Sequence, residues 1–186
     1  MANAAKKTAT YQDVMNAPRH QVAELIHGTL SVLPRPAALH ARASSRLGSK
    51  LGRPFDEGEG GPGGWVILDE PELHLGSDIL VPDLAGWRRA RMPQIPDAAF
   101  FTLAPDWVCE VLSPSTEQID RTDKVPIYAA TGVAHAWLMS PLARTLEVLE
   151  LDGRTFRIIS THKNDERVRA RPFDAIEFEL GALWER

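Results

Sequence analysis

Two short apolar stretches each contain one carboxylate, and these acids are the first candidates for chemistry. Asp83 lies in the run from Val81 to Ala85, and Glu110 lies in the run from Trp107 to Leu112. An acid inside such a run is costly to bury unless it is paired or binds a cation. If the two stretches are neighbouring strands, both acids can hold one hard cation such as Mg²⁺.

A lysine on the next predicted helix completes the candidate catalytic group. Lys124 lies one helical turn after Asp120, on the same face. Two carboxylates and a lysine are sufficient for metal-assisted phosphodiester hydrolysis. Asp83 can also be interpreted as a turn acid and Lys124 as a surface lysine. Glu110 is harder to explain in this way, because its neighbours are apolar on both sides and a buried glutamate needs a partner.

These residues need a framework that brings them together, and the sequence predicts an α/β (α+β) fold with a central mixed β-sheet flanked by helices. Apolar runs predict the strands, and amphipathic or capped segments predict the helices. We expect Pro126 to kink the second helix or delay its start. The predicted strands are Trp65–Leu68, Ile79–Gly86, Asp106–Leu112 and Ala134–Met139, and the helices packed on them are Leu39–Arg53 and Ile119–Thr131.

An N-terminal hairpin supplies a second group of candidates. Val22–Ile26 and Thr29–Leu33 are separated by His27-Gly28, which is typical of a tight turn. Glu24 should face away from Ala23 and Leu25, either into solvent or into a site. A lone helical histidine is more often packed than catalytic, so His40 is a weaker candidate. Glu72 is a further acid that could position water or a second metal.

Basic residues at helical spacing form a stripe on the helix that follows the hairpin. One interpretation is a solvated basic face, and the other is contact with a phosphate backbone. The members of this basic stripe are Arg42, Arg46, Lys50 and Arg53. Arg88, Arg89 and Arg91, which follow Trp87, are a second candidate for contact with a phosphate backbone.

Length and charge limit the possible classes of protein. With 186 residues, we expect one domain, 1–186, with residues 1–9 flexible. A net charge of −4 argues against strong non-specific binding of nucleic acid, although it allows a local basic stripe. Cys109 is the only cysteine, which excludes an internal disulfide, and we expect it to be buried. Neither a signal peptide nor a membrane-spanning run is predicted, so we expect a cytoplasmic protein.

Several motifs together give the sequence a family resemblance between about residues 10 and 150. The motifs are Leu80–Ala85, Glu110–Thr116, Asp120-Arg121 with Lys124, Tyr128-Ala129 with Gly132-Val133, His135, Trp137-Leu138, and Glu24–Gly28 followed by His40. With these motifs the chain resembles the Uma2 (DUF820-like) family of restriction-endonuclease-like proteins, and this implies a PD-(D/E)XK nuclease core. By this resemblance Asp83 is the aspartate of the motif and Glu110 its second acid. Leu112 stands at the usual position of the lysine, and Lys124 matches the lysine that the family supplies from the following helix.

The residues and the resemblance together predict a metal-dependent endonuclease that hydrolyses phosphodiester bonds of DNA. Asp83 and Glu110, with the main-chain carbonyl of Val111, would hold Mg²⁺ or Mn²⁺. Lys124 would orient water or stabilise charge, and Glu24 and His40 are further catalytic candidates.

Two alternatives and the oligomeric state stay open. The first alternative is a non-catalytic nucleic-acid-binding or scaffold protein that retains the nuclease fold. The second is a sugar hydrolase that uses Asp83 and Glu110 as acid and base, which gives Lys124 no role. A homodimer is as compatible with the sequence as a monomer.

Overall fold

Two β-sheets form the framework of the computed structural model, which describes residues 8–185. The larger sheet has six strands in the order β10-β9-β8-β7-β6-β3, and β7 runs parallel to β8 while the other neighbours are antiparallel. The predicted α+β fold with a mixed sheet is therefore confirmed. The strands of this sheet are β3 (Trp65–Asp69), β6 (Leu84–Arg88), β7 (Trp107–Val111), β8 (His135–Ser140), β9 (Thr145–Asp152) and β10 (Thr155–Lys163).

The smaller sheet has four antiparallel strands in the order β2-β1-β5-β4. Its two outer pairs are hairpins, and the β1–β2 hairpin turns at His27 and Gly28 as predicted. Its strands are β1 (Gln21–Ile26), β2 (Thr29–Pro34), β4 (Leu73–Leu75) and β5 (Asp78–Leu80). A short ribbon of β11 (Arg167–Val168) and β12 (Phe178–Glu179) lies near the C-terminus.

One predicted strand is wrong, because the segment Ile79–Gly86 is divided between the two sheets. Its first part, β5, pairs with β1 and β4, whereas β6 pairs with β3 and β7. Pro82 lies between the two parts and has no N–H to give to a ladder, so a continuous central strand is unfavourable there. The crossing from one sheet to the other places Asp83 at their junction.

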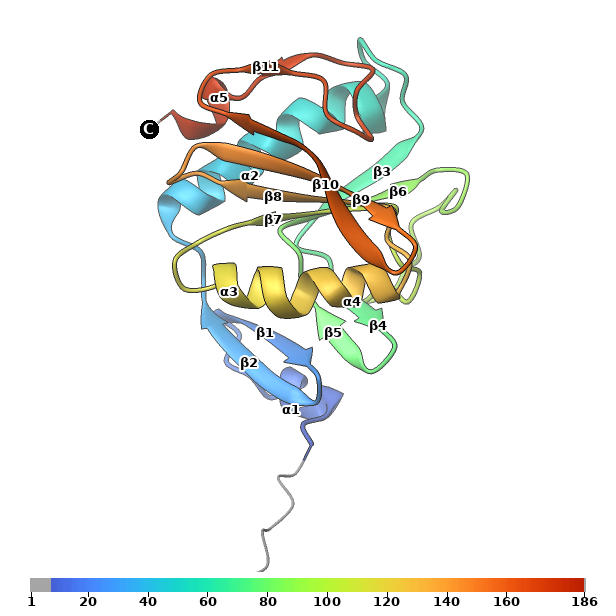
Figure 1. Cartoon of the computed structure of the whole chain (residues 1–186). Helices are drawn as coiled ribbons and strands as arrows, with labels where there is room; N and C mark the ends of the chain where they lie inside the picture. The colour runs from blue at the N-terminus through green and yellow to red at the C-terminus, as the bar shows by residue number, and fades with distance from the viewer. Residues whose placement is uncertain (1–7, 186) are drawn as a thin grey trace, which may run out of the picture.

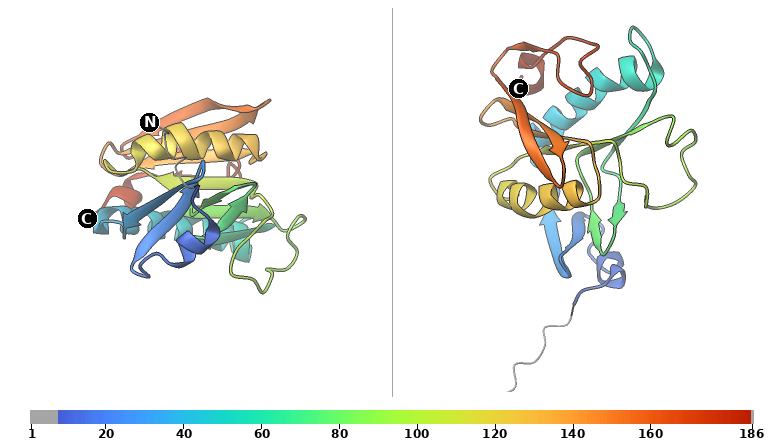
Figure 2. Two further views of the ribbon diagram at one scale, coloured as in Figure 1. Left: turned by 90° about the horizontal axis from the view of Figure 1, so that it is seen from below. Right: turned by 45° about the vertical axis from the view of Figure 1, so that its right-hand side comes forward.

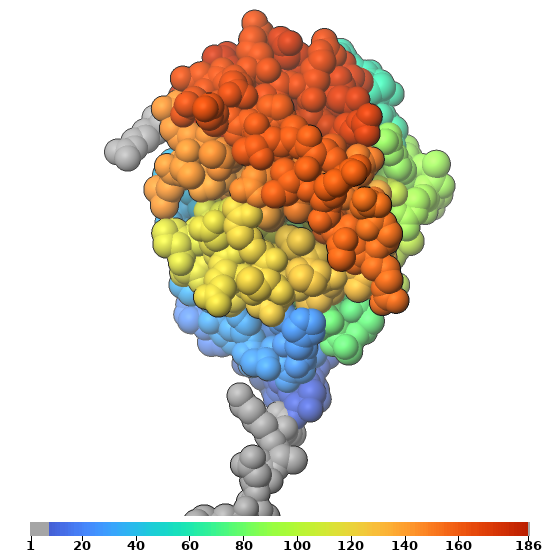
Figure 3. All heavy atoms as spheres, viewed as in Figure 1, coloured from blue at the N-terminus to red at the C-terminus, as the bar shows by residue number. Residues whose placement is uncertain are grey.

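A helix crosses from β7 to the parallel strand β8, as parallel neighbours require. It consists of α3 (Glu117–Ile119), the π-helical turn η2 (Asp120–Lys124) and α4 (Val125–Ala130). The late start that Pro126 suggested is wrong, because the helix begins at Glu117. Pro126 is the second residue of α4 and follows the π-helical turn, so the hydrogen-bond register of the helix changes directly before the proline. Figures 1 and 3 show this helix between the β1–β2 hairpin and the strands of the larger sheet.

The helix α2 (Ala38–Leu51) packs on the other side of the larger sheet (Figures 1 and 2). The sequence predicted that this helix would end at Arg53. Instead the chain continues as a π-helical segment, η1 (Gly52–Glu57), and Gly58 ends it with a φ of 76°. Pro54 and Phe55 are buried in this segment, so tertiary packing overrides the local helix-breaking signal.

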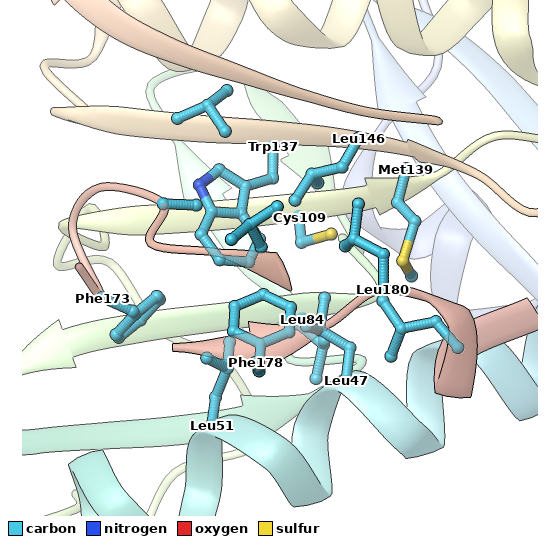
Figure 4. Close-up of a cluster of buried hydrophobic side chains, with 14 of the residues drawn as sticks. Leu47, Leu51, Leu84, Cys109, Trp137, Met139, Leu146, Phe173, Phe178 and Leu180 are labelled. Atoms are coloured by element: carbon cyan, nitrogen blue, oxygen red, sulfur yellow. The ribbon is translucent and has the colours of Figure 1, made fainter. Parts of the chain in front are cut away.

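The main core lies between α2, the larger sheet and the C-terminal segment. Figure 4 shows Leu47 and Leu51 pointing from α2 toward the sheet, with Phe173 and Phe178 packed around Trp137. The Trp137 indole also donates a 2.7 Å hydrogen bond to the Arg171 carbonyl, which ties the C-terminal segment to β8. Cys109 is buried in the same core, as predicted. The chain ends with α5 (Gly181–Trp184) near α2.

A smaller cluster holds the N-terminal part on the hairpin. Ala23 and Leu25 of β1 pack with Val14 of α1 (Tyr11–Met15), and Glu24 faces the other way, as its position in the strand predicted. Of the segment 1–9 that we expected to be flexible, residues 1–7 lie outside the described residues, and Ala9 donates a hydrogen bond to the Gly28 carbonyl. Across residues 8–185 no helix combines the length and apolarity needed to cross a membrane.

The packing of α2 predicts a measurable cost for shortening one of its leucines. Leu47 is fully buried, so Leu47→Ala should lower the free energy of unfolding by about 2–5 kcal/mol. Leu142, which is 65% exposed, is the matched control, and Leu142→Ala should change it by less than about 0.5 kcal/mol. Urea unfolding curves measure both. Equal effects of the two substitutions would contradict this description of the core.

Candidate functional site

A cavity of about 390 Å³ lies where the two sheets and the crossover helix meet. Four of the charged side chains in its lining come from four different segments. Glu24 comes from β1, Asp83 from the crossing between the sheets, Glu110 from β7 and Lys124 from η2. The three residues singled out first in the sequence are therefore brought together, and Glu24 joins them.

The Lys124 ammonium is the centre of this cluster. Its Nζ lies 2.9 Å from Oε1 of Glu24 and 2.9 Å from Oε1 of Glu110, and it is 3.7 Å from Oδ1 of Asp120. The Lys124 side chain is only 4% exposed, and those of Glu24 and Glu110 are equally hidden. A single buried ammonium thus joins the smaller sheet to the larger one.

Glu110 has a second partner that the sequence analysis missed. The Tyr128 hydroxyl donates a 2.6 Å hydrogen bond to Oε1 of Glu110, the same oxygen that Lys124 approaches. Tyr128 is fully buried and lies one turn after Lys124 on the helix. That spacing is the signal that could have found it, because residues four apart share a helix face.

Asp83 is held at the end of β7. Its Oδ2 accepts a 2.7 Å hydrogen bond from the Val111 N–H, and its Oδ1 lies 3.4 Å from Nε2 of His40. The other ring nitrogen of His40, Nδ1, is buried and has no hydrogen-bond partner among residues 8–185. His40 therefore belongs to the same cavity, with one nitrogen at Asp83.

Burial dominates the electrostatics of the acids. It raises the pKa of Asp83 to about 7, although the Val111 N–H and the charge of Lys124 act in the opposite direction. Burial likewise raises the pKa of Glu110 well above its usual range, against the effect of Lys124. Repulsion by neighbouring acids is a lesser cause, with Asp120 acting on both carboxyls.

The cluster contains more acids than cations. Burial alone would lower the pKa of Lys124, but the charges of Glu110 and Glu24 more than offset this and raise it, so the lysine stays an ammonium. Burial also raises the pKa of Asp120. One ammonium faces Glu24, Asp83, Glu110 and Asp120, so the cavity favours protons or an added cation.

The residues present fit a hard divalent cation that keeps part of its water shell. Among residues 8–185 no group of three or more His, Cys, Asp and Glu side chains forms a metal cage. Mg²⁺ commonly uses one or two carboxylates, with waters and substrate phosphates completing its shell. Asp83 and Glu110 supply two carboxylates in one cavity, and Val111 lies in the lining beside them.

The basic stripe lies away from this cavity. Arg42 donates to the Glu185 carbonyl, Arg53 pairs with Glu59, and Arg46 and Lys50 line a separate hollow. The side of α2 nearest the acids carries Ser44, in a hollow that also includes His40 and Asp83. Arg42 and Arg46 are each two residues from Ser44, about 200° around the helix, which is the opposite side. The role of the stripe in binding nucleic acid stays a prediction.

The arginines after Trp87 lie at the far end of β6, roughly 15 Å along the strand from Asp83. Arg88 stacks on the Trp65 ring, Arg89 pairs with Asp56, and Arg91 pairs with Asp106. They brace that end of the sheet and do not line the cavity.

Glu72 and Arg35 differ in their relation to the cavity. Glu72 pairs with His74 at 2.7 Å and is not among the residues that line the cavity. Arg35, which the sequence analysis missed, lines the cavity and pairs with Glu70 at 2.9 Å. The sequence offered no signal for Arg35, because it is a single arginine between two prolines.

The comparisons with known proteins agree with this geometry. The family model described as "Uma2: Putative restriction endonuclease" matches residues 9–181. The chain belongs to the Uma2 family. This confirms the resemblance found in the sequence, and it makes a nuclease-like function the expectation for the cavity.

One solved structure has a similar fold. It is described as a putative nuclease belonging to DUF820 from Anabaena variabilis ATCC 29413, with 22% identity and a TM-score of 0.75. The match covers 95% of this chain and 97% of that chain. No curated protein matches the sequence.

The raised pKa of Asp83 predicts a pH-dependent stability. An unfolded aspartate loses its proton near pH 4, whereas folded Asp83 keeps it to about pH 7. The folded state therefore binds more protons in this window, and the contribution of Asp83 to stability falls as pH rises from about 4 to 7. Asp83→Asn removes this pH-dependent contribution. The free energy of unfolding of the wild type should therefore fall relative to that of the variant as pH rises from about 4 to 7.

Urea unfolding of metal-free protein between pH 4 and 8 measures this difference. Asp174→Asn is the control, because it makes the same substitution at an exposed position outside the cavity. Parallel stability curves for the wild type and Asp83→Asn would contradict the assigned pKa.

Proposed function

We propose that this Uma2 protein is a metal-dependent endonuclease that hydrolyses phosphodiester bonds of DNA, with Mg²⁺ or Mn²⁺ as its cofactor. The observation that carries the proposal is the Lys124 ammonium, held 2.9 Å from Glu110 in a buried cavity that also contains Asp83. Metal-dependent phosphodiester hydrolysis needs two carboxylates and a positive group in one place. Membership of the Uma2 family supports the same conclusion.

In this proposal Asp83 and Glu110 hold the metal ion. When bound, a divalent cation polarises the scissile phosphate and lowers the pKa of a water molecule. Lys124 and Tyr128 both bind Oε1 of Glu110, which leaves Oε2 as the oxygen for the ion. The Val111 N–H holds Oδ2 of Asp83, so Oδ1, which lies 3.4 Å from Nε2 of His40, would be the oxygen for the ion. Short contacts thus fix one oxygen of each carboxylate.

Lys124 is the group that stabilises charge on the phosphate. A preorganised ammonium in a water-poor site is most effective where negative charge develops during the reaction. Glu24 and Asp120 also hold the ammonium, so it keeps its place when Glu110 turns toward the metal. Burial lowers the pKa of His40, so this ring is neutral at pH 7 and can accept a proton from the attacking water.

A non-catalytic nucleic-acid-binding protein is the second candidate, and one observation favours it. Lys124 already has two carboxylate partners, at 2.9 Å each, and the usual lysine position on the strand is Leu112. If the lysine cannot leave these partners, the cavity would bind nucleic acid without cleaving it. Measurement of cleavage separates the two functions.

The first test concerns the two carboxylates. Wild-type protein should cleave plasmid DNA only with Mg²⁺ or Mn²⁺, and Asp83→Ala should abolish cleavage because one metal-binding carboxylate is lost. Glu110→Gln should abolish metal binding in calorimetry for the same reason. Asp174→Ala, at an exposed position, should keep both activities. A Glu110→Gln protein that binds metal and cleaves at the wild-type rate would overturn the assignment.

The second test concerns the lysine. Lys124→Ala should still bind metal, because the carboxylates remain, but cleavage should slow by roughly 100-fold or more with the loss of charge stabilisation. Circular dichroism before the assay checks that the variant is folded, since Glu24 and Glu110 lose their buried partner. Cleavage at an unchanged rate would show that another basic group, such as His40, has this role.

A further inference from the structure

We infer that the cavity receives one unpaired nucleotide, and that the protein therefore acts on single-stranded DNA in preference to duplex. This inference rests on the proposed function and specifies its substrate. It follows from the walls of the cavity, which the proposed reaction does not use.

One wall is the inner face of the β1–β2 hairpin. Val22 and Leu33 are direct partners in the hairpin register, so their side chains lie on one face. Glu24 lies two residues beyond Val22 on the same face, about 7 Å further along the strand. All three line the cavity, so the hairpin presents an apolar surface next to the buried acid.

The exposure of these side chains shows an order from the floor to the mouth. Glu24 and Lys124 are 4% exposed at the floor, whereas Arg35, two residues after Leu33, is 55% exposed at the mouth. The cavity therefore places the reactive groups deepest, an apolar wall above them and a guanidinium outside. A nucleotide has matching parts, with the scissile phosphate at the floor, the base against the wall and a neighbouring phosphate at Arg35.

The mouth is bounded by two backbone segments. The connection from β2 to α2 passes close to the turn that precedes α3, and both segments line the cavity (Figure 1). Pro34 and Pro36 belong to the first segment, and Ser113 and Pro114 belong to the second. Prolines and leucines can contact the faces of bases, as apolar wedges do in other nucleic-acid complexes.

The volume of the cavity favours single-stranded DNA over duplex DNA. About 390 Å³ is at the small end of ligand pockets, which suits one nucleotide and not a base pair. A nucleotide inside a duplex would have to leave its stack and lose its pairing to reach the floor of the cavity. An unpaired nucleotide loses little stacking and no pairing energy. Single strands are also bound through base stacking together with basic groups along the backbone.

Arg35 can exchange its present partner for a phosphate at low cost. Its ion pair with Glu70 is exposed on both sides, at 55% and 41%. Such surface pairs contribute little to stability, so a phosphate can replace the carboxylate.

The test compares three oligonucleotides of equal length in the presence of Mg²⁺. They are a dT 20-mer, the same strand paired with dA, and a 20-mer of abasic sites that has the backbone without bases. The wild type should cleave the dT strand at least tenfold faster than the duplex or the abasic strand, measured as kcat/KM.

A wall variant and its matched control show where the preference arises. Leu33→Ala should slow cleavage of the dT strand about fivefold to tenfold, because the base loses part of its contact surface, and leave the abasic strand unaffected. Val32→Ala shortens the neighbouring residue on the opposite face of the same strand and should change neither rate. Neither residue belongs to the proposed catalytic group.

Equal rates on single strand and duplex would overturn the inference, as would a Leu33→Ala variant that slows the dT and abasic strands equally. If no DNA were cleaved, the proposed function would fail instead. Fluorescence anisotropy with the same three oligonucleotides would then decide the inference alone. The inference would be supported if the dT strand binds most tightly and Leu33→Ala weakens that binding. Equal binding of the three oligonucleotides would overturn it.

Discussion

The buried contact between Lys124 and its two glutamates is the constraint on which the rest of the structure depends. A charge in this position is tolerated only with close partners, because water cannot compensate it. Glu24 belongs to the smaller sheet and Glu110 to the larger one, so the contact forms only when the two sheets meet at the crossover helix. The π-helical turn that carries Lys124 lies at this meeting point, and the helix therefore has to pass between the hairpin and the larger sheet (Figure 1).

The same side chains satisfy the backbone where the chain crosses from one sheet to the other. Glu24 accepts a 2.8 Å hydrogen bond from the Val81 N–H, and Lys124 approaches the Val81 carbonyl at 3.5 Å. Asp83 in turn accepts the Val111 N–H at the end of β7. Buried backbone groups that lie outside a ladder need such partners. The candidate catalytic residues therefore also stabilise the fold. Their substitution should alter both activity and stability, so both have to be measured for each variant.

The sequence predicted those parts of the site that depend on local pattern. Glu110 stood out because its neighbours are apolar, and Glu24 could be assigned to a strand face from its position between Ala23 and Leu25. What the sequence did not predict depends on contacts between distant segments. The division of Ile79–Gly86 at Pro82, the partnership of Tyr128 with Glu110 and the location of Arg35 at the cavity mouth are of this kind. The basic stripe shows the limit of a local pattern, since helical spacing defines a face of α2 but not what that face contacts.

The balance of charge in the cavity links its stability to the proposed chemistry. Burial raises the pKa of Asp83 and Glu110, so each tends to hold a proton when no cation is near. Under the proposed function, a divalent ion would bind the deprotonated carboxylates and displace these protons, so its affinity would increase with pH. Glu24 and Asp120 also hold the Lys124 ammonium, so under the proposed function it would keep its place beside the phosphate while Glu110 holds an ion. In this way one ammonium stabilises the buried acids and, under the proposed function, the reacting phosphate.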